Sequence, residues 1–511
     1  MDAAAVRALR SDLAAARFTV DALSTVWGSG AEAALERGDR VPARRALAGN
    51  DSATAVLARL FILGLDESPR AVVAALPALG IAGAETLGLI ASSTRVRPLL
   101  DLRPYAFLDA RGAGEWWIAS DLGELATGSA LRTDHVLGVG GASVTLSGLL
   151  LPGPVDTALD LGTGCGIQAL HLARESRRVV ATDISQRALD LAELNAAVNG
   201  VDSIEFRLGS LFDPVAGERF DRIVSNPPFV ITPRREDVPA YEYRDGGLVG
   251  DEIVSRIVGG VGEHLVPGGI AQLLGNWEYR DGRDGLERAL GWTDDAALDT
   301  WIVERETLDP ARYAETWIRD GGTQPGSPGY ESLVDAWLDD FAQRGVTAVG
   351  FGYLLLRRAH GGGGTADRRL RRAERLDAPL NAGGSGAAAS GLGAHLASVL
   401  AAHDAIAALD DAGLLALHPA VAPDVTEERS HWPGAEHPTV ITLRQGGGFR
   451  REVRVGTALA AVVGACDGEL ALGAILGAVA SILEIDVEAL TAEIVPEVRE
   501  LVLAGLLSAS R

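Results

Sequence analysis

Lysine is absent from this sequence, and cysteine and methionine are almost absent. All 46 basic residues are arginines, and the 511 residues include two cysteines and one methionine. Cys165 and Cys466 are too few and too far apart in the sequence for a disulfide framework or a cysteine-ligated zinc site. The nine histidines show no spacing typical of metal ligands. We therefore expect no metal centre.

Long apolar segments are missing as well. Arg7, Arg10 and Asp12 interrupt the first turns of the chain, where a signal peptide would have a basic start and an apolar core. The longest uncharged apolar run, Leu470–Leu483, contains glycine and is shorter than the about 20 residues of a membrane-spanning helix. The sequence therefore predicts a cytoplasmic protein that does not bind membranes.

Acidic residues outnumber basic ones. With 69 Asp and Glu against 46 Arg, the formal net charge is −23. Non-specific binding to nucleic acid depends on neutralising phosphates, so this charge argues against a protein that coats RNA or DNA. A local basic face is still compatible with it. The candidate is a strip of five arginines within 368–375, which is either a solvated linker or a contact for phosphate groups.

The order of predicted elements divides the chain into four parts. Residues 1–145 contain short amphipathic helices and a β hairpin around 111–114, a combination that resembles a winged helix. Residues 146–360 alternate between strands and helices, which predicts an α/β domain with parallel crossovers. Residues 361–393 form a Gly- and Arg-rich linker. Residues 394–511 form a last α+β domain of helices and a hairpin, also winged-helix-like.

The α/β part has strand and helix signals in a regular order. We expect strands at 156–162, 178–184, 203–210, 221–226, 269–278, 298–308 and 348–358, with helices at 166–174, 186–199 and 251–265.

A glycine-rich turn follows the first of these strands in the stretch ALDLGTGCG. Gly162, Gly164 and Gly166 let the backbone turn tightly and approach a ligand, and the amides of the next helix point into the same space. The G-x-G-x-G spacing differs from the G-x-G-x-x-G of dinucleotide sites. Asp160 precedes the first glycine, where a carboxylate can face the cationic end of a cofactor.

The next strand ends at an acidic residue. Asp183 lies 17 residues after Gly166 (183 − 166) and is suitably placed to accept hydrogen bonds from two ribose hydroxyls. A second interpretation is that Asp183 caps the following helix, a role that Ser185 could share.

A second motif ends the strand in FDRIVSNPPFV, Phe220–Val230. Proline cannot donate to a strand ladder, and each proline biases the preceding residue away from helix. Asn226-Pro227-Pro228-Phe229 is therefore expected as a stiff loop that carries one amide side chain and one aromatic face, which suits the binding of a small planar group.

In this order the two motifs resemble class I S-adenosylmethionine-dependent methyltransferases of the "methyltransferase small" type, from about Val155 to Trp277. The resemblance implies a seven-stranded, mostly parallel Rossmann-like sheet, S-adenosyl-L-methionine as cofactor, and methyl transfer to a planar nitrogen. It places the methionine part at the glycine turn, the ribose at Asp183 and the adenine at Ser210 and Leu211. The cofactor-binding residues that it implies are Asp160, Gly162, Thr163, Gly164, Gly166, Asp183, Ile184, Ser210, Leu211 and Asn226.

The resemblance makes Asn226, Pro227, Pro228 and Phe229 the catalytic residues. The Asn226 side-chain oxygen and the Pro227 carbonyl can each accept one N–H of the acceptor, which directs the nitrogen lone pair toward the methyl group. Phe229 can lie flat against the planar group. No general base is required, because a methylated, cationic nitrogen loses its proton to water.

The identity of the acceptor stays open at this point. The segment from Tyr241 to Gly269 resembles the glutamine methyltransferases of release factors, with Tyr241 and Glu242 at their Glu-containing turn, although Tyr243 replaces the usual proline. The same core occurs in enzymes that methylate bases of ribosomal RNA or DNA. We therefore expect a protein partner or a nucleic acid, with a small molecule as a third alternative. A non-catalytic, cofactor-binding adaptor is a further alternative, against which the intact Asn-Pro-Pro motif counts.

Overall fold

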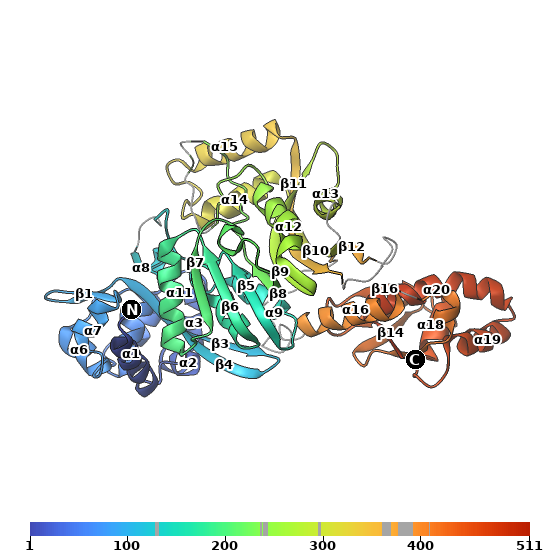
Figure 1. Ribbon diagram of the computed structural model, residues 1–511, viewed down its shortest axis with the longest axis horizontal. Coiled ribbons are helices and arrows are strands. Elements are labelled where there is room, and N and C mark those ends of the chain that lie inside the picture. Colours follow the sequence, from blue (N-terminus) through green and yellow to red (C-terminus); the bar gives the residue numbers. More distant parts are fainter. Residues whose placement is uncertain are drawn as a thin grey trace. The chain divides into compact units, whose positions relative to one another are not determined.

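The computed structural model describes residues 1–511 except for 128–131, 236–237, 239–243, 295–297, 360–368, 377–391, 408 and 511. The chain divides into two compact units (Figure 1). The first contains residues 1–147, 154–360 and 372–374, and the second contains 148–153, 361–371 and 375–511.

The first unit begins with short helices whose starts are fixed by polar side chains. Asp2, Thr19, Ser52 and Ser68 each accept a backbone N–H of the following turn. The helices are α1 (Ala3–Ala15), α2 (Val20–Trp27), α3 (Ser29–Glu36), α4 (Val41–Ala46), α5 (Ala53–Leu57) with the π-helical turn η1 (Ala58–Ile62), α6 (Pro69–Ala75) and α7 (Gly80–Thr86).

Two antiparallel hairpins follow these helices. β1 (Ile90–Ser92) pairs with β2 (Val96–Pro98), and β3 (Leu100–Asp109) pairs with β4 (Gly112–Asp121). The second hairpin is the one expected around residues 111–114. The short helices α8 (Glu124–Thr127) and α9 (Gly141–Leu149) lead from it to the central sheet.

The central sheet has the order β12-β10-β11-β9-β8-β5-β6-β7. The neighbouring strands among β5 to β9 are parallel to one another, whereas β11 is antiparallel to both β9 and β10. The strands are β5 (Val155–Leu161), β6 (Ser176–Asp183), β7 (Ile204–Leu208), β8 (Phe220–Ser225), β9 (Leu265–Arg280), β10 (Leu298–Leu308), β11 (Val346–Arg358) and β12 (Arg371–Arg375). The expected Rossmann-like α/β fold is confirmed.

Helices follow the strands as the alternating pattern predicts. α10 (Ile167–Ala173) follows β5, α11 (Gln186–Asn199) follows β6, and α12 (Glu252–His264) precedes β9. The remaining helical elements of this part are η2 (Asp213–Val215), α13 (Gly285–Leu290), η3 (Gly291–Thr293), α14 (Pro310–Asp320) and α15 (Tyr330–Gln343). The last two lie between β10 and β11.

The sheet has eight strands, one more than the seven expected. The eighth, β12, lies within the arginine strip and inside the segment expected as a linker. Its residues alternate between exposed and half-buried positions, and the inner side chains contact β10: Trp301 Nε1 donates to Glu374 at 2.5 Å, and the Arg372 guanidinium lies 5.5 Å from the Trp301 ring. Because these residues are highly charged, the sequence pattern did not reveal that they form an edge strand whose side chains alternate with a period of two.

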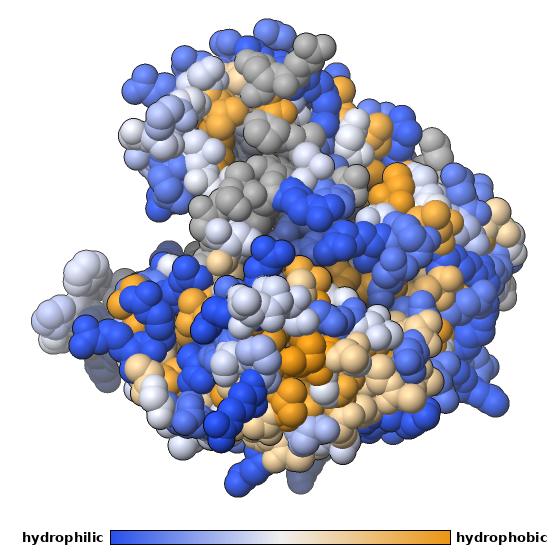
Figure 2. Space-filling model, turned by 90° about the vertical axis from the view of Figure 1, so that its left-hand side faces the viewer, coloured by the Kyte–Doolittle hydropathy of each residue, from blue (hydrophilic) through white to orange (hydrophobic). Residues whose placement is uncertain are grey.

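The N-terminal helices share one hydrophobic core with the sheet domain. Leu9, Leu57 and Phe61 belong to the same buried cluster as Ile167 of α10 and Leu194 of α11. Figure 2 shows the face of the molecule on the side of α1, α6 and α7, where hydrophobic surface gathers in the lower half and is bordered by hydrophilic residues.

The second unit has its own core. Its elements are α16 (Leu392–Ile406), α17 (Asp411–Leu415), β13 (His418–Val421), β14 (Val425–Ser430), β15 (Val440–Gln445), β16 (Glu452–Val455), α18 (Thr457–Gly464), α19 (Leu472–Leu483), α20 (Val487–Leu503) and β17 (Leu507–Ser510). β14, β15 and β16 form an antiparallel sheet, and β13 pairs with β17. The hairpin expected in this part of the chain is β15–β16. Among the helices described in either unit, none has the length and apolar character needed to cross a bilayer.

Candidate active site

A cavity of about 400 Å³ lies at the carboxyl ends of the parallel strands. Strand order reverses at β5, with β6 on one side and β8 on the other, and open α/β sheets bind ligands at such a switch point. Four turns line the cavity, after β5, β6, β7 and β8. Of the residues predicted from the sequence, those on its wall are Gly162, Thr163, Gly164, Asp183, Ile184, Ser210, Leu211, Asn226, Pro227 and Pro228.

The glycine turn is held in a conformation that other residues rarely adopt. Gly162 and Gly164 have φ angles of +76° and +55°, and a Cβ at either position would meet nothing within 4 Å. Gly166 is different, because a Cβ there would lie 2.9 Å from that of Ala192 on α11. Gly162 and Gly164 therefore leave open space for a ligand, whereas Gly166 allows α10 and α11 to pack closely and does not line the cavity.

Asp160 stabilises this turn through hydrogen bonds in the protein interior. It is fully buried, and its Oδ2 accepts the Thr163 hydroxyl at 2.5 Å and the Ala169 backbone N–H at 2.9 Å. Burial raises its pKa to about 7. Its Oδ1 has no hydrogen-bond partner among the described residues, and Asp160 does not line the cavity. The carboxylate that we expected to face the cofactor thus lies in the interior of the turn.

Asp183 lies at the end of β6, on the cavity wall. Its Oδ2 accepts the Gly164 N–H and its Oδ1 accepts the Ser185 N–H, both at 2.9 Å. Burial raises its pKa. A carboxylate has about four acceptor sites, so each oxygen can accept one further hydrogen bond from a diol. Ser185 is the N-cap residue of α11, and its side chain makes no capping bond.

The loop after β7 forms the outer rim. Leu211 has a φ of +47°, which is unusual for a residue with a side chain, and it lines the cavity together with Ser210. Ile184 also lines the cavity and is 68% exposed. These apolar side chains give the rim two surfaces against which a flat ring can pack.

Asn226 follows β8 on the opposite wall. Its Oδ1 is buried and has no hydrogen-bond partner among the described residues. The strand is anchored just before it, because Ser225 donates to the Leu161 carbonyl of β5 at 2.7 Å. A buried acceptor without a partner is costly, so this oxygen is suited to accept an N–H from a bound molecule.

Phe229 points away from the cavity wall. Its ring centroid lies 5.0 Å from that of Phe351 and 6.2 Å from that of Trp317, and the residue is buried. Phe229 does not line the cavity. In this structure it therefore anchors the Asn-Pro-Pro turn through the hydrophobic core, in place of the flat contact with a planar group that the sequence led us to expect.

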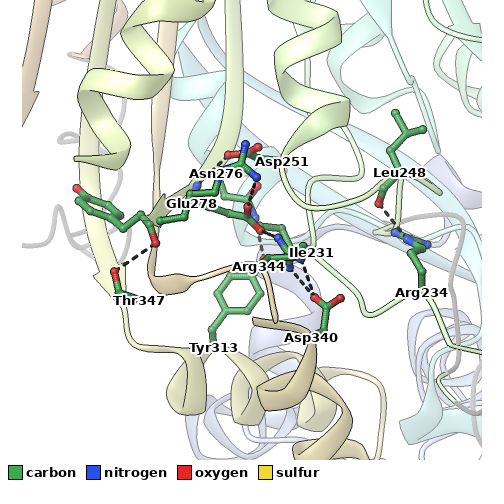
Figure 3. Close-up of polar contacts among 12 residues, drawn as sticks. Ile231, Arg234, Leu248, Asp251, Asn276, Glu278, Tyr313, Asp340, Arg344 and Thr347 are labelled. Atoms are coloured by element: carbon green, nitrogen blue, oxygen red, sulfur yellow. Dashed lines mark hydrogen bonds and ion pairs between the residues drawn. The ribbon is translucent and has the colours of Figure 1, made fainter. Parts of the chain in front are cut away.

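The chain after Phe229 is fixed by the insertion between β10 and β11. The hydroxyl of Tyr313 on α14 accepts the Ile231 N–H at 3.1 Å and an N–H of Asn276 at 2.7 Å (Figure 3). Arg244 donates to the Trp317 carbonyl at 2.8 Å and to Asp320 at 2.9 Å. Ile231 and Arg244, which follow Asn226 in the chain, are thereby both attached to α14.

Buried ion pairs support the same region from the side of β9. Glu278 is fully buried and pairs with Arg344, which also binds Asp340 at 2.5 Å (Figure 3). Asp251 accepts the Glu278 N–H at 2.9 Å and pairs with Arg288. Removing one partner of such a pair leaves an uncompensated buried charge, so the network holds its elements at fixed distances.

Several wall residues were not predicted from the sequence. They are Asp134, His135, Val136, Leu137, Gly138, Ser143, Gln168, Asp245, Gly246 and Gly247. Burial lowers the pKa of His135, which keeps its ring neutral. Two features of the sequence could have indicated these residues. They are the glycines of HVLGVGGAS, which precedes β5, and the RDGG turn after the Asn-Pro-Pro motif.

Tyr241 and Glu242 fall outside the described residues. His171, on the helix after the glycine turn, is buried and packs edge-on against Tyr105, Phe107 and Trp116 of the β3–β4 hairpin. Burial lowers its pKa to about 4, so it is a neutral core residue.

Two families match this chain by sequence. Residues 141–293 match the model of the methyltransferase small domain, and residues 15–98 match that of a domain of unknown function (DUF7059). The first match confirms the resemblance of the middle of the chain to class I methyltransferases of the methyltransferase small type.

Curated relatives match over the same region. The chain is 37% identical over 182 residues to the release factor glutamine methyltransferase of Xylella fastidiosa strain Temecula1, covering 34% of this chain and 60% of the relative. It is 36% identical over 171 residues to the ribosomal protein uL3 glutamine methyltransferase of Bradyrhizobium diazoefficiens, covering 31% and 53%. The chain thus spans between half and two thirds of the length of these relatives.

Among solved structures, the ribosomal protein L11 methylase of Lactobacillus delbrueckii aligns with 42% of this chain and 77% of its own, at 20% identity and a TM-score of 0.25.

Proposed function

We propose that this chain is an S-adenosyl-L-methionine-dependent N-methyltransferase whose acceptor is a glutamine side chain of a protein. The observation that carries the proposal is the buried Oδ1 of Asn226, which has no hydrogen-bond partner among the described residues and belongs to the wall of a cavity that also holds a glycine turn and Asp183. An acceptor without a donor, beside a site for a nucleoside, suits a substrate that brings an N–H group.

The residues that line the cavity fit the cofactor. The open space beside Gly162 and Gly164 admits the methionine part of the cofactor close to the backbone of the turn. Asp183 keeps two acceptor sites for ribose hydroxyls. Ser210, Leu211 and Ile184 provide a rim for the adenine ring. When bound, S-adenosylmethionine supplies an electrophilic methyl group, so the protein needs only to present a nitrogen to it.

The Asn-Pro-Pro turn prepares that nitrogen. An amide nitrogen is a poor nucleophile because its lone pair is delocalised into the carbonyl. The Asn226 oxygen and the Pro227 carbonyl each accept one of its N–H groups, which orients the lone pair away from them. Orientation of this kind can supply up to about 7–11 kcal/mol. The two acceptors also stabilise the positive charge that develops on nitrogen, and the proton then passes to water.

Protein glutamine is favoured over a nucleobase for two reasons. The two relatives described above are named for glutamine methylation of a release factor and of a ribosomal protein. The net charge of −23 also disfavours binding to a phosphate backbone. In the arginine strip, Arg372 pairs with Glu374 and stacks on Trp301. The winged-helix-like character of both flanks and a cytoplasmic location remain predictions.

The test uses the full-length protein, tritiated S-adenosylmethionine and an extract of cells that lack the gene. One half of the extract is treated with ribonuclease and deoxyribonuclease, and the other half with protease. We expect label that survives nuclease and is lost to protease, and mass spectrometry should locate it on glutamine. Label lost to nuclease would contradict the choice of a protein acceptor. Binding of cofactor with no label in either half would support a non-catalytic adaptor and overturn the proposed activity.

A further inference from the structure

A second buried acceptor without a partner among the described residues belongs to a residue of the cavity wall. Gln168 is the second residue of α10 and lines the cavity, and its side chain is 3% exposed. Its Nε2 donates to the Ser143 carbonyl of α9 at 2.8 Å. Its Oε1 is buried and has no hydrogen-bond partner among the described residues.

The Ser143 carbonyl fixes which way this amide faces. A carbonyl can only accept, so the NH2 end of Gln168 must point to Ser143, and the oxygen must point to the other side. Ser143 also lines the cavity. The side chain is therefore held with its acceptor in a set position, and a buried amide oxygen without a donor costs free energy until a ligand supplies one.

The order of the strands indicates which part of a nucleoside cofactor lies here. In the proposed function, the adenine lies at the end of β7 and the ribose at the end of β6, so the rest of the molecule runs on toward β5 and β8. α10 directly follows the β5 turn, which places Gln168 at this far end. The amino-acid part of S-adenosylmethionine carries one strong donor group, its α-ammonium, and a carboxylate that can only accept.

We propose that Gln168 binds the α-ammonium of the cofactor through Oε1 and so distinguishes the complete cofactor from nucleosides that lack an amino group. This inference rests on the proposed function, because it requires S-adenosylmethionine as the ligand. The bond would join a neutral acceptor to a charged donor, a type that contributes about 1.5–3 kcal/mol, or roughly ten- to hundred-fold in affinity.

The experiment measures binding by calorimetry and needs no acceptor substrate. The ligands are S-adenosylhomocysteine and its analogue without the α-amino group, 5′-S-(3-carboxypropyl)-5′-thioadenosine. We expect Gln168→Leu to weaken S-adenosylhomocysteine at least tenfold while the affinity for the desamino analogue changes less than twofold.

A matched control comes from the second unit. Gln445 is also buried and donates to backbone carbonyls through Nε2, and its Oε1 has no partner among the described residues, but it belongs to the second unit. Gln445→Leu should leave both affinities unchanged. An equal loss of affinity for both ligands in Gln168→Leu would overturn the ammonium contact and make Gln168 a structural residue. If the wild-type protein binds neither ligand, the proposed cofactor itself is wrong.

Discussion

The side-chain amide of Asn195 pairs with the backbone of Ala119 through two hydrogen bonds. Asn195 Oδ1 accepts the Ala119 N–H at 2.7 Å, and its Nδ2 donates to the Ala119 carbonyl at 2.9 Å. One turn later on α11, Asn199 makes the same two bonds to Trp117, at 3.0 and 2.8 Å. The edge of β4 is thus paired by helix side chains, as it would otherwise be paired by a neighbouring strand.

These two asparagines differ in one further contact. Asn195 Nδ2 also donates to the Cys165 carbonyl in the glycine turn at 2.8 Å, whereas Asn199 donates to the Asn195 carbonyl of its own helix. Asn195 therefore connects the N-terminal hairpin to the cavity wall. We expect Asn195→Ala and Asn199→Ala each to lower the free energy of unfolding by roughly 2–4 kcal/mol, because each leaves buried backbone groups unpaired.

Only Asn195→Ala should also weaken S-adenosylhomocysteine, by several-fold, because the Cys165 carbonyl loses its donor. Urea denaturation and calorimetry on both variants would measure the two effects. Equal affinities in the two variants would show that the glycine turn does not depend on this contact.

The second prediction concerns the ribose contact of Asp183. Asp183→Ala removes both the acceptors for the diol and the bonds to Gly164 and Ser185. We expect the dissociation constant of S-adenosylhomocysteine to rise about 100-fold or more, since two hydrogen bonds to a charged group are lost. Asp190→Ala, on the exposed side of α11, should bind normally. An unchanged constant in Asp183→Ala would remove its proposed role.

The third prediction separates binding from transfer. Asn226→Ala removes the unpaired oxygen on the acceptor side of the cavity. Label transfer to extract protein should fall at least 100-fold, while the affinity for S-adenosylhomocysteine should stay within a few-fold, because orientation of the nitrogen is lost and the nucleoside contacts remain. Asn50→Ala, away from the cavity, serves as the control. Retained methyl transfer in Asn226→Ala would contradict the proposed mechanism.

The parts of the site that the sequence predicted are those encoded over a few consecutive residues. Gly162 and Gly164 need positive φ, and Asp183 ends its strand at the same edge of the sheet, so local pattern and sheet topology suffice to bring them together. The same holds for Asn226 and its prolines.

The unpredicted parts depend on tertiary packing. Gln168 and Asn195 are polar residues within helices, where a single sequence does not show whether they face solvent or a neighbouring element. Phe229 turned out to pack on α14 and β11, because the insertion between β10 and β11 supplies Trp317 as a partner. β12 was missed because arginines on a strand edge and arginines in a linker have the same composition.

The fourth prediction concerns pH and Asp160. Its pKa in the folded protein is about 7, against about 3.9 for an unfolded chain, so between these values the folded state binds more protons than the unfolded state. The contribution of this group to stability is therefore present below about pH 4 and is lost as the pH rises through 7. Asp160→Asn removes the titration and keeps an acceptor for Thr163 and Ala169.

Differential scanning calorimetry at pH 5 and pH 8 would test this sign. The Tm of the wild type minus that of Asp160→Asn should be higher at pH 5 than at pH 8. Taking the difference cancels the titration of all other carboxylates that the two proteins share. A difference that is constant, or that grows with pH, would show that Asp160 is ionised throughout this range.

The fifth prediction concerns Tyr313, which holds the loop after the Asn-Pro-Pro motif. Tyr313→Phe leaves the Ile231 N–H and an Asn276 N–H without their acceptor, so the loop that carries Asn226 should loosen. A displacement of about 1 Å in a positioned group can cost roughly 100-fold in rate. We expect label transfer to fall between about tenfold and 100-fold with unchanged affinity for S-adenosylhomocysteine. Tyr279→Phe is the matched control, since its hydroxyl donates to Glu304 at 2.7 Å in the same sheet. Both variants should lose stability, and only Tyr313→Phe should lose transfer; equal transfer in the two would make Tyr313 a residue of the core alone.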